Sequence, residues 1–110
     1  INMASNEVHI DVVEEMDGYF VDYWKQMITY KGKVITQMYE KGSISKEDVT
    51  EISELVLGKK PGRKHAKQSL YCSSMGIGAL DIMVAYQIFQ NAVEMKLGTT
   101  AKLWDNPMWE

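Results

Sequence analysis

Residues 70–81 read LYCSSMGIGALD, and this stretch decides the fold of the chain. It begins as a short strand, which we expect over residues 68–73, and runs into a long helix, which we expect over residues 76–97. Apolar residues recur along this helix at spacings of three and four: Ile77, Leu80, Val84, Ile88, Ala92 and Met95. Because the first half of the helix is apolar on nearly every side, the sequence predicts that this half is deeply buried.

Further elements are expected on both sides of this stretch. They are a short helix capped by Asp11, a strand over residues 19–21 that ends at Asp22, a helix over residues 24–41 with Lys33 on its surface, a helix capped by Ser45 that ends at Gly58, and a last strand over residues 99–104. The predicted class is α/β, helix-rich, with two or three short strands and one long helix. So few strands do not complete a sheet, and the chain begins with Ile1 rather than Met. We therefore expect a fragment of a larger protein, one that associates with itself or with a partner chain.

Composition excludes several classes of protein. The 110 residues carry a net charge of −3, and a protein that reads a phosphate backbone needs concentrated Lys and Arg instead. No apolar run is long enough to cross a bilayer, and no signal peptide opens the chain. Cys72 is the only cysteine in the sequence, so no internal disulfide is expected. A soluble cytoplasmic protein that binds neither nucleic acid nor membrane is the prediction.

No complete catalytic, cofactor or metal motif is found in the sequence. There is no G-x-G-x-x-G and no P-loop. His9 and His65 have no partner at metal-ligand spacing, so we expect each to be a surface or packing residue. Cys72 stands in an apolar context and is expected to be a small buried hydrophobe rather than a nucleophile. The sequence therefore predicts no catalytic residue and no metal site.

The junction between the strand and the long helix is the best candidate site. Ser74, Met75 and Gly76 would present a hydroxyl and free amides at the start of a helix, where a polar or anionic ligand group is favoured. The alternative interpretation is that Ser74 is an ordinary helix cap. Asp81, a carboxylate in the apolar half of the helix, would need a partner, and a structural ion pair with Arg63 or a lysine is the favoured interpretation over catalysis.

The junction and the basic loop before it together resemble the C-terminal region of ornithine cyclodeaminase/mu-crystallin proteins. Residues 58–63 read GKKPGR, and about seven residues later comes LYCSSMGIGALD. In that family the order is G-x-x-P-G-R, a strand, and then S-V-G-x-A-x-x-D with a long helix. Val21-Asp22 is similar to a late strand of the family that ends in Asp. The resemblance covers residues 7–104.

The resemblance implies a dimer of two-domain subunits whose central Rossmann domain binds NAD(H) or NADP(H). Residues 1–110 would form a single C-terminal segment, in which residues 11–58 end the cofactor-binding domain and residues 59–104 return to the substrate and dimerisation domain. Activities of the family are ornithine cyclisation with loss of ammonia, dehydrogenation of alanine and related amino acids, and ketimine reduction. The implied parent protein is an NAD(P)-dependent oxidoreductase or cyclodeaminase-like enzyme that acts on the C–N bond of an amino acid or imine.

Carried over residue by residue, Ser74, Met75 and Gly76 match the segment of the family that faces the nicotinamide. Asp81 matches the acid of the long helix, to which the resemblance gives a structural role. The glycine-rich cofactor loop, and the Lys and Arg that hold the substrate carboxylate, have no counterpart in the 110 residues. We therefore expect the chain alone to be inactive and to bind no dinucleotide with useful affinity.

One departure from the family pattern concerns a catalytic acid. Family members often carry G-x-D-x-P-G-K-x-E-L before the short helix, and that Asp transfers protons in the cyclodeaminases. Residues 1–10 here read INMASNEVHI, so Asn2 or Met3 stands nearest to the acid, and neither is a general base. This speaks against ornithine cyclisation and leaves open a non-catalytic small-molecule-binding or assembly protein like mu-crystallin. An unrelated small helical interaction domain stays a third interpretation.

Overall fold

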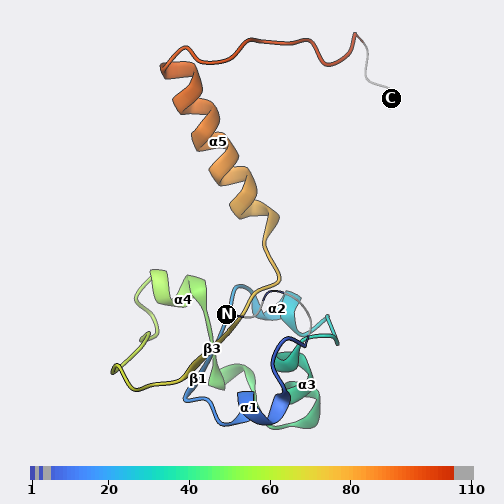
Figure 1. Cartoon of the computed structure of the whole chain (residues 1–110), viewed down its shortest axis with the longest axis vertical. Coiled ribbons are helices and arrows are strands. Elements are labelled where there is room, and N and C mark those ends of the chain that lie inside the picture. The colour runs from blue at the N-terminus through green and yellow to red at the C-terminus, as the bar shows by residue number, and fades with distance from the viewer. Residues whose placement is uncertain (2, 4–5, 106–110) are drawn as a thin grey trace. The chain divides into compact units, whose positions relative to one another are not determined.

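A three-stranded parallel sheet organises the first part of the chain (Figure 1). The structure is a computed structural model that describes residues 1, 3 and 6–105. Strand β1 (Gly18–Val21) lies between β2 (Val49–Glu51) and β3 (Leu70–Ser73) and runs parallel to both. The strands predicted over residues 19–21 and 68–73 are thereby confirmed, and so is the α/β class. Because all strands run the same way, their carboxyl ends meet at one edge of the sheet.

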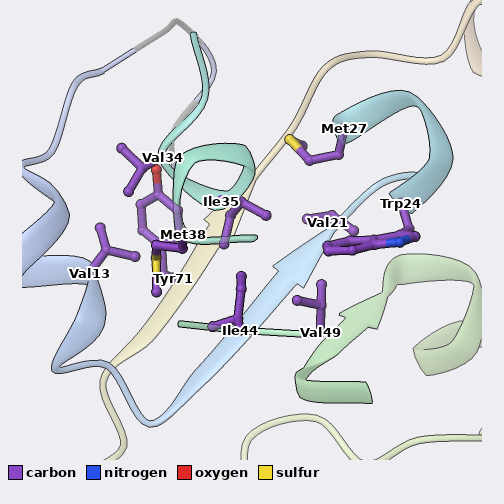
Figure 2. Close-up of a cluster of buried hydrophobic side chains, with 10 residues drawn as sticks. All are labelled: Val13, Val21, Trp24, Met27, Val34, Ile35, Met38, Ile44, Val49 and Tyr71. Carbon is purple, nitrogen blue, oxygen red and sulfur yellow. The ribbon is translucent and has the colours of Figure 1, made fainter. Parts of the chain in front are cut away.

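Three helices cover one face of this sheet and enclose the core. They are α1 (Ile10–Glu14), α2 (Trp24–Met27) and α3 (Val34–Lys41). Figure 2 shows the apolar side chains that these helices and the strands bury together: Val13, Val21, Trp24, Met27, Val34, Ile35, Met38, Ile44, Val49 and Tyr71. Removing this apolar surface from water is the main stabilising contribution to the unit. The short helix α4 (Ile52–Val56) follows β2 and buries no residue completely.

The single helix predicted over residues 24–41 is wrong, because the chain forms α2 and α3 with a turn between them. The hydroxyl of Thr29 donates to the carbonyl of Gln26, and the hydroxyl of Thr36 donates to the carbonyl of Met27, each at 2.7 Å. Side chains thus satisfy carbonyl groups that a continuous helix would pair with amides four residues on. The break places Lys33 at the N-cap of α3, and its side chain is only 2% exposed, not on the surface as predicted.

The helix predicted between Ser45 and Gly58 is confirmed as an α-helix only in its second half, as α4 (Ile52–Val56). Ser45 does form a capping box with Asp48, but this box begins only the 3-10 turn η1 (Lys46–Asp48). The chain then enters β2, in which Val49 pairs with Tyr19 of β1 and is fully buried. β-branched residues at positions 49 and 50 favour a strand, and pairing with β1 outweighs the helical spacing of Val49 with Ile52 and Val56.

The first helix begins two residues earlier than predicted. Helix α1 starts at Ile10, and His9 is its N-cap, with the imidazole Nδ1 accepting from the amide of Asp11 at 3.4 Å. Asp11 therefore lies within the first turn, where its negative charge still favours the helix N-terminus.

The second compact unit, Gly78–Glu110, contains the long helix α5 (Gly78–Glu94), which confirms the predicted helix over a shorter range. The predicted burial of its first half is wrong, because Leu80, Ile82 and Val84 are at least 60% exposed and residues 78–105 contain no element that covers them. Asp81 is exposed as well, so burial does not force a partner on it. Residues 99–104 form no strand. Among the described residues, no helix combines the length and the apolar character needed to cross a membrane.

Candidate functional site

The segment Ser74–Met75–Gly76 follows β3 directly and lies at the carboxyl edge of the sheet. Helix α5 begins only at Gly78, so Ser74 does not occupy the N-cap position of that helix. Gly76 has a φ of +85°, a left-handed conformation that side chains rarely adopt, and a Cβ placed there would meet no atom within 4 Å. Gly76 is exposed and Ser74 is half-buried. The segment therefore leaves an open face on which a ligand can approach the backbone.

The carboxylate of Asp22 holds this segment to the end of β1. Asp22 Oδ2 accepts from the hydroxyl of Ser74 at 2.9 Å, from the amide of Met75 at 2.8 Å and from the amide of Gly76 at 2.7 Å. Asp22 Oδ1 accepts from the amide of Tyr23 at 2.9 Å. The amides expected to be free for a ligand thus bind a carboxylate of the protein itself.

These contacts fix the charge of Asp22, which is only 8% exposed. Burial by itself would raise the pKa of the Asp22 carboxyl. The hydrogen bonds from the Ser74 hydroxyl and from the amides of Gly76, Met75 and Tyr23 outweigh burial and leave the pKa below the value of 3.8 usual for aspartate. Asp22 is therefore ionised at neutral pH and only accepts hydrogen bonds.

Lys33 holds the same segment from its backbone side. The Lys33 ammonium donates to the carbonyl of Ser74 at 2.8 Å and to the carbonyl of Met3 at 2.9 Å. Ser74 is thus fixed at two points by buried charged groups, at its hydroxyl by Asp22 and at its carbonyl by Lys33. Sequence reasoning missed Lys33, because helical spacing placed it on an outer face of a helix that the structure interrupts.

The other residues singled out in the sequence do not join this site. His9 caps α1, and His65 is exposed. Cys72 is half-buried rather than buried, and desolvation raises the pKa of its thiol. A nucleophilic cysteine needs the opposite shift. Met3, which the sequence places near the catalytic acid of the family, contributes its backbone carbonyl to Lys33, and Asn2 lies outside the described residues.

The arrangement suits recognition of a polar ligand group better than bond-breaking by the protein. In open α/β sheets, ligands bind beyond the carboxyl ends of parallel strands, and Asp22 and Ser74 follow the carboxyl ends of β1 and β3. The lone pairs of the Ser74 oxygen and the open space beside Gly76 remain accessible there. Neither residue is a general base or a nucleophile activated by a neighbouring base.

Comparison with known proteins identifies the family of the chain. Residues 3–96 match the sequence profile of the ornithine cyclodeaminase/mu-crystallin family. The chain is also similar to the N-((2S)-2-amino-2-carboxyethyl)-L-glutamate dehydrogenase of Staphylococcus aureus (strain NCTC 8325 / PS 47), with 36% identity over 104 residues. That alignment covers 94% of this chain and 31% of the relative, so the chain spans about a third of the relative's length. The chain belongs to the ornithine cyclodeaminase/mu-crystallin family.

Proposed function

We propose that this chain is the C-terminal part of an NAD(P)-dependent oxidoreductase that acts on the C–N bond of an amino acid or imine, and that Ser74–Gly76 contacts the nicotinamide. The observation that carries the proposal is the open face at Gly76, next to a Ser74 that two buried charged residues hold in place. A rigidly held hydroxyl beside exposed backbone is suited to orienting a planar ligand group.

The named relative supports the reaction class. It is a dehydrogenase of an N-substituted glutamate, a compound in which carbon atoms adjoin an amine nitrogen. Oxidation of such a compound removes a hydride from the carbon and a proton from the nitrogen, which converts the C–N single bond to an imine. A small amino-acid-like substrate and a homo-oligomeric protein with a Rossmann domain are the corresponding proposals for the whole protein.

The open space beside Gly76, where a Cβ would meet no atom within 4 Å, leaves room for a nicotinamide ring. When bound, the cofactor supplies the acceptor or donor of hydride, while Ser74 and the backbone around Gly76 orient its ring and exclude water from one side. The described residues of this chain offer no glycine-rich loop for the pyrophosphate, so those contacts are assigned to other parts of the full-length protein. Asp22 is not assigned a proton-transfer role, because its carboxylate is fully engaged in holding the junction.

Two substitutions of Ser74 in the full-length protein test the proposal. If the hydroxyl contacts the cofactor, Ser74→Ala should weaken cofactor binding by about fivefold to tenfold, which corresponds to the loss of one hydrogen bond. Ser74→Leu should weaken it further, because its side chain enters the open face. Melting temperature and the dissociation constant for the reduced cofactor are measured on the same samples. Lowered stability with unchanged affinity in both variants would contradict the proposal.

A second candidate function is that of a non-catalytic small-molecule-binding or assembly protein. The observation that favours it is the N-terminal segment, in which Met3 stands near the position of the family's proton-transferring acid. Met3 has no ionisable side chain, so ornithine cyclisation is not proposed for this protein. Saturable cofactor binding without turnover of any amino acid or imine tried would favour this second function.

A further inference from the structure

The Ser74 hydroxyl has only one hydrogen atom to donate. In the structure that hydrogen is directed at Asp22, whose carboxylate oxygen lies 2.9 Å from the Ser74 oxygen. An ionised carboxylate cannot return a hydrogen bond. The direction of the hydroxyl is therefore set by Asp22 and not by a ligand.

Rotation of the hydroxyl away from Asp22 is opposed by burial. Asp22 is 8% exposed, so water does not readily replace a lost donor. The residue as a whole is also fixed, because the 2%-exposed ammonium of Lys33 holds the Ser74 carbonyl at 2.8 Å. Towards its open side, Ser74 then offers only oxygen lone pairs, one of which lies 3.3 Å from the Gly76 amide.

We propose that Asp22 is a positioning residue that makes Ser74 a hydrogen-bond acceptor towards the ligand, so that the junction selects a ligand group that carries N–H bonds. The carboxamide of nicotinamide is such a group, because its NH₂ donates where a methyl ketone in the same place cannot. This inference rests on the proposed function, since it takes a nicotinamide dinucleotide as the ligand at Ser74. It assigns Asp22 a role in selectivity and no contact with the reacting atoms.

The test compares two dinucleotides on the full-length protein by titration calorimetry. One is oxidised NAD or NADP, whichever binds, and the other is its 3-acetylpyridine analogue, in which methyl replaces the amide nitrogen. The wild-type protein should bind the nicotinamide form about tenfold more tightly, as expected for one additional hydrogen bond in a partly desolvated site. Asp22→Ala removes the acceptor and frees the Ser74 hydrogen to point at the ligand, so the preference should fall towards unity.

Two further variants show whether Asp22 acts through Ser74. Ser74→Ala should abolish the preference, and the double variant should show no larger loss than either single one, because both changes remove the same acceptor. Asp17→Asn is the matched control. Asp17 accepts from the amide of Ser69 at 2.8 Å at the other end of the same two strands, and its substitution should leave the preference intact.

An Asp22→Ala variant that keeps the wild-type preference, or an additive loss in the double variant, would overturn the inference. Should Asp22→Ala fail to fold, NMR titration of the Asp22 carboxyl in Ser74→Ala decides the matter. Loss of the donor should raise the pKa of Asp22, and an unchanged pKa would overturn the inference without any ligand present. One further outcome is that the wild-type protein binds neither dinucleotide while Ser74→Ala still raises the pKa of Asp22. In that case the proposed function and the nicotinamide ligand are both wrong, and only the coupling between Asp22 and Ser74 is confirmed.

Discussion

Asp22 and Ser74 stand 52 residues apart in the sequence, and their side chains join the carboxyl ends of β1 and β3. The same separation joins Asp17 to Ser69 before these strands begin, where Asp17 Oδ2 accepts from the Ser69 amide and the Asp17 amide donates to the Ser69 carbonyl, both at 2.8 Å. An aspartate thus clamps each end of one strand pair. The contact between Asp17 and Ser69 fixes the register of β1 and β3 where these strands begin. The contact between Asp22 and Ser74, where the strands end, also shapes the candidate site.

Stability should depend on pH through Asp22. Its pKa in the folded protein is lowered from 3.8, so its contribution is fully present above about pH 4 and is lost as pH falls through the folded pKa. Asp22→Asn should therefore flatten part of the fall in melting temperature between about pH 5 and about pH 2. Other acids contribute to the wild-type profile, so the difference between the two profiles isolates Asp22. Parallel profiles would contradict the prediction.

Replacement of Lys33 by Met should destabilise the first unit by about 1–3 kcal/mol, because the carbonyls of Ser74 and Met3 lose a buried charged donor. Lys25→Met, on an exposed position of α2, should change stability by less than about 0.5 kcal/mol. Denaturant unfolding measures the free energy of unfolding of both variants. Hydrogen exchange should also speed up in residues 70–77 only in Lys33→Met, and equal exchange in the two variants would count against the assigned role.

Two threonines allow a matched comparison of hydroxyl contacts. Each donates to a carbonyl of the α2 end at 2.7 Å, but Thr36 is fully buried and Thr29 is exposed. Thr36→Val should cost about 1–1.5 kcal/mol, since the buried Met27 carbonyl loses its shorter donor and keeps only the Tyr30 amide at 3.2 Å. Thr29→Val should cost less than about 1 kcal/mol, because water replaces the hydroxyl. Denaturant unfolding curves check both values, and similar losses would show that burial does not decide the cost.

Gly76 and Gly42 form a second matched pair. Both have positive φ, +85° and +80°, and a Cβ at either position would meet no atom within 4 Å. Alanine at either position should cost roughly 1–2 kcal/mol of backbone strain. Only Gly76→Ala should also weaken dinucleotide binding by the full-length protein, by about tenfold or about 1.4 kcal/mol. Equal affinities in the two variants would place the ligand away from Gly76.

The isolated 110 residues should self-associate through α5. One face of this helix carries Ile82, Phe89 and Val93, each at least 60% exposed. Exposed apolar surface of this kind drives association. Replacing these three residues with Gln should lower the mass measured by light scattering at micromolar concentration, whereas Gln87→Ala on another face should not. A wild-type chain that is monomeric would refute the prediction.

Local patterns predicted those elements whose neighbours in sequence decide them. The short run of β-branched and aromatic residues before Asp22 predicted β1, and the spacing of apolar residues predicted α5, although not its exposure. Whether the side chains of α5 are buried depends on the surfaces that pack against this helix, and a local sequence pattern does not contain those surfaces. β2 was missed because Val49 fits a helical stripe equally well, and only its pairing with Tyr19 decides the matter.

The candidate site was predictable only in part. Ser74–Gly76 was found from its place between a strand and a helix, but the use of its amides by Asp22 was not. Recognising that contact requires knowing that β1 and β3 are neighbours, which depends on chain topology. The role of Lys33 was hidden in the same way, because it depends on a helix break that the threonine hydroxyls support.

The position of β1 between two partners that follow it sets an order for folding during synthesis. The residues that pair with β1 on its β3 side are made 52 residues later than those of β1. At usual rates of translation this delay is roughly three to ten seconds. During that time one edge of β1 lacks its final neighbour, and an open strand edge is a place where other nascent chains attach. The segment around β1 is therefore in greatest need of a chaperone before β3 has left the ribosome.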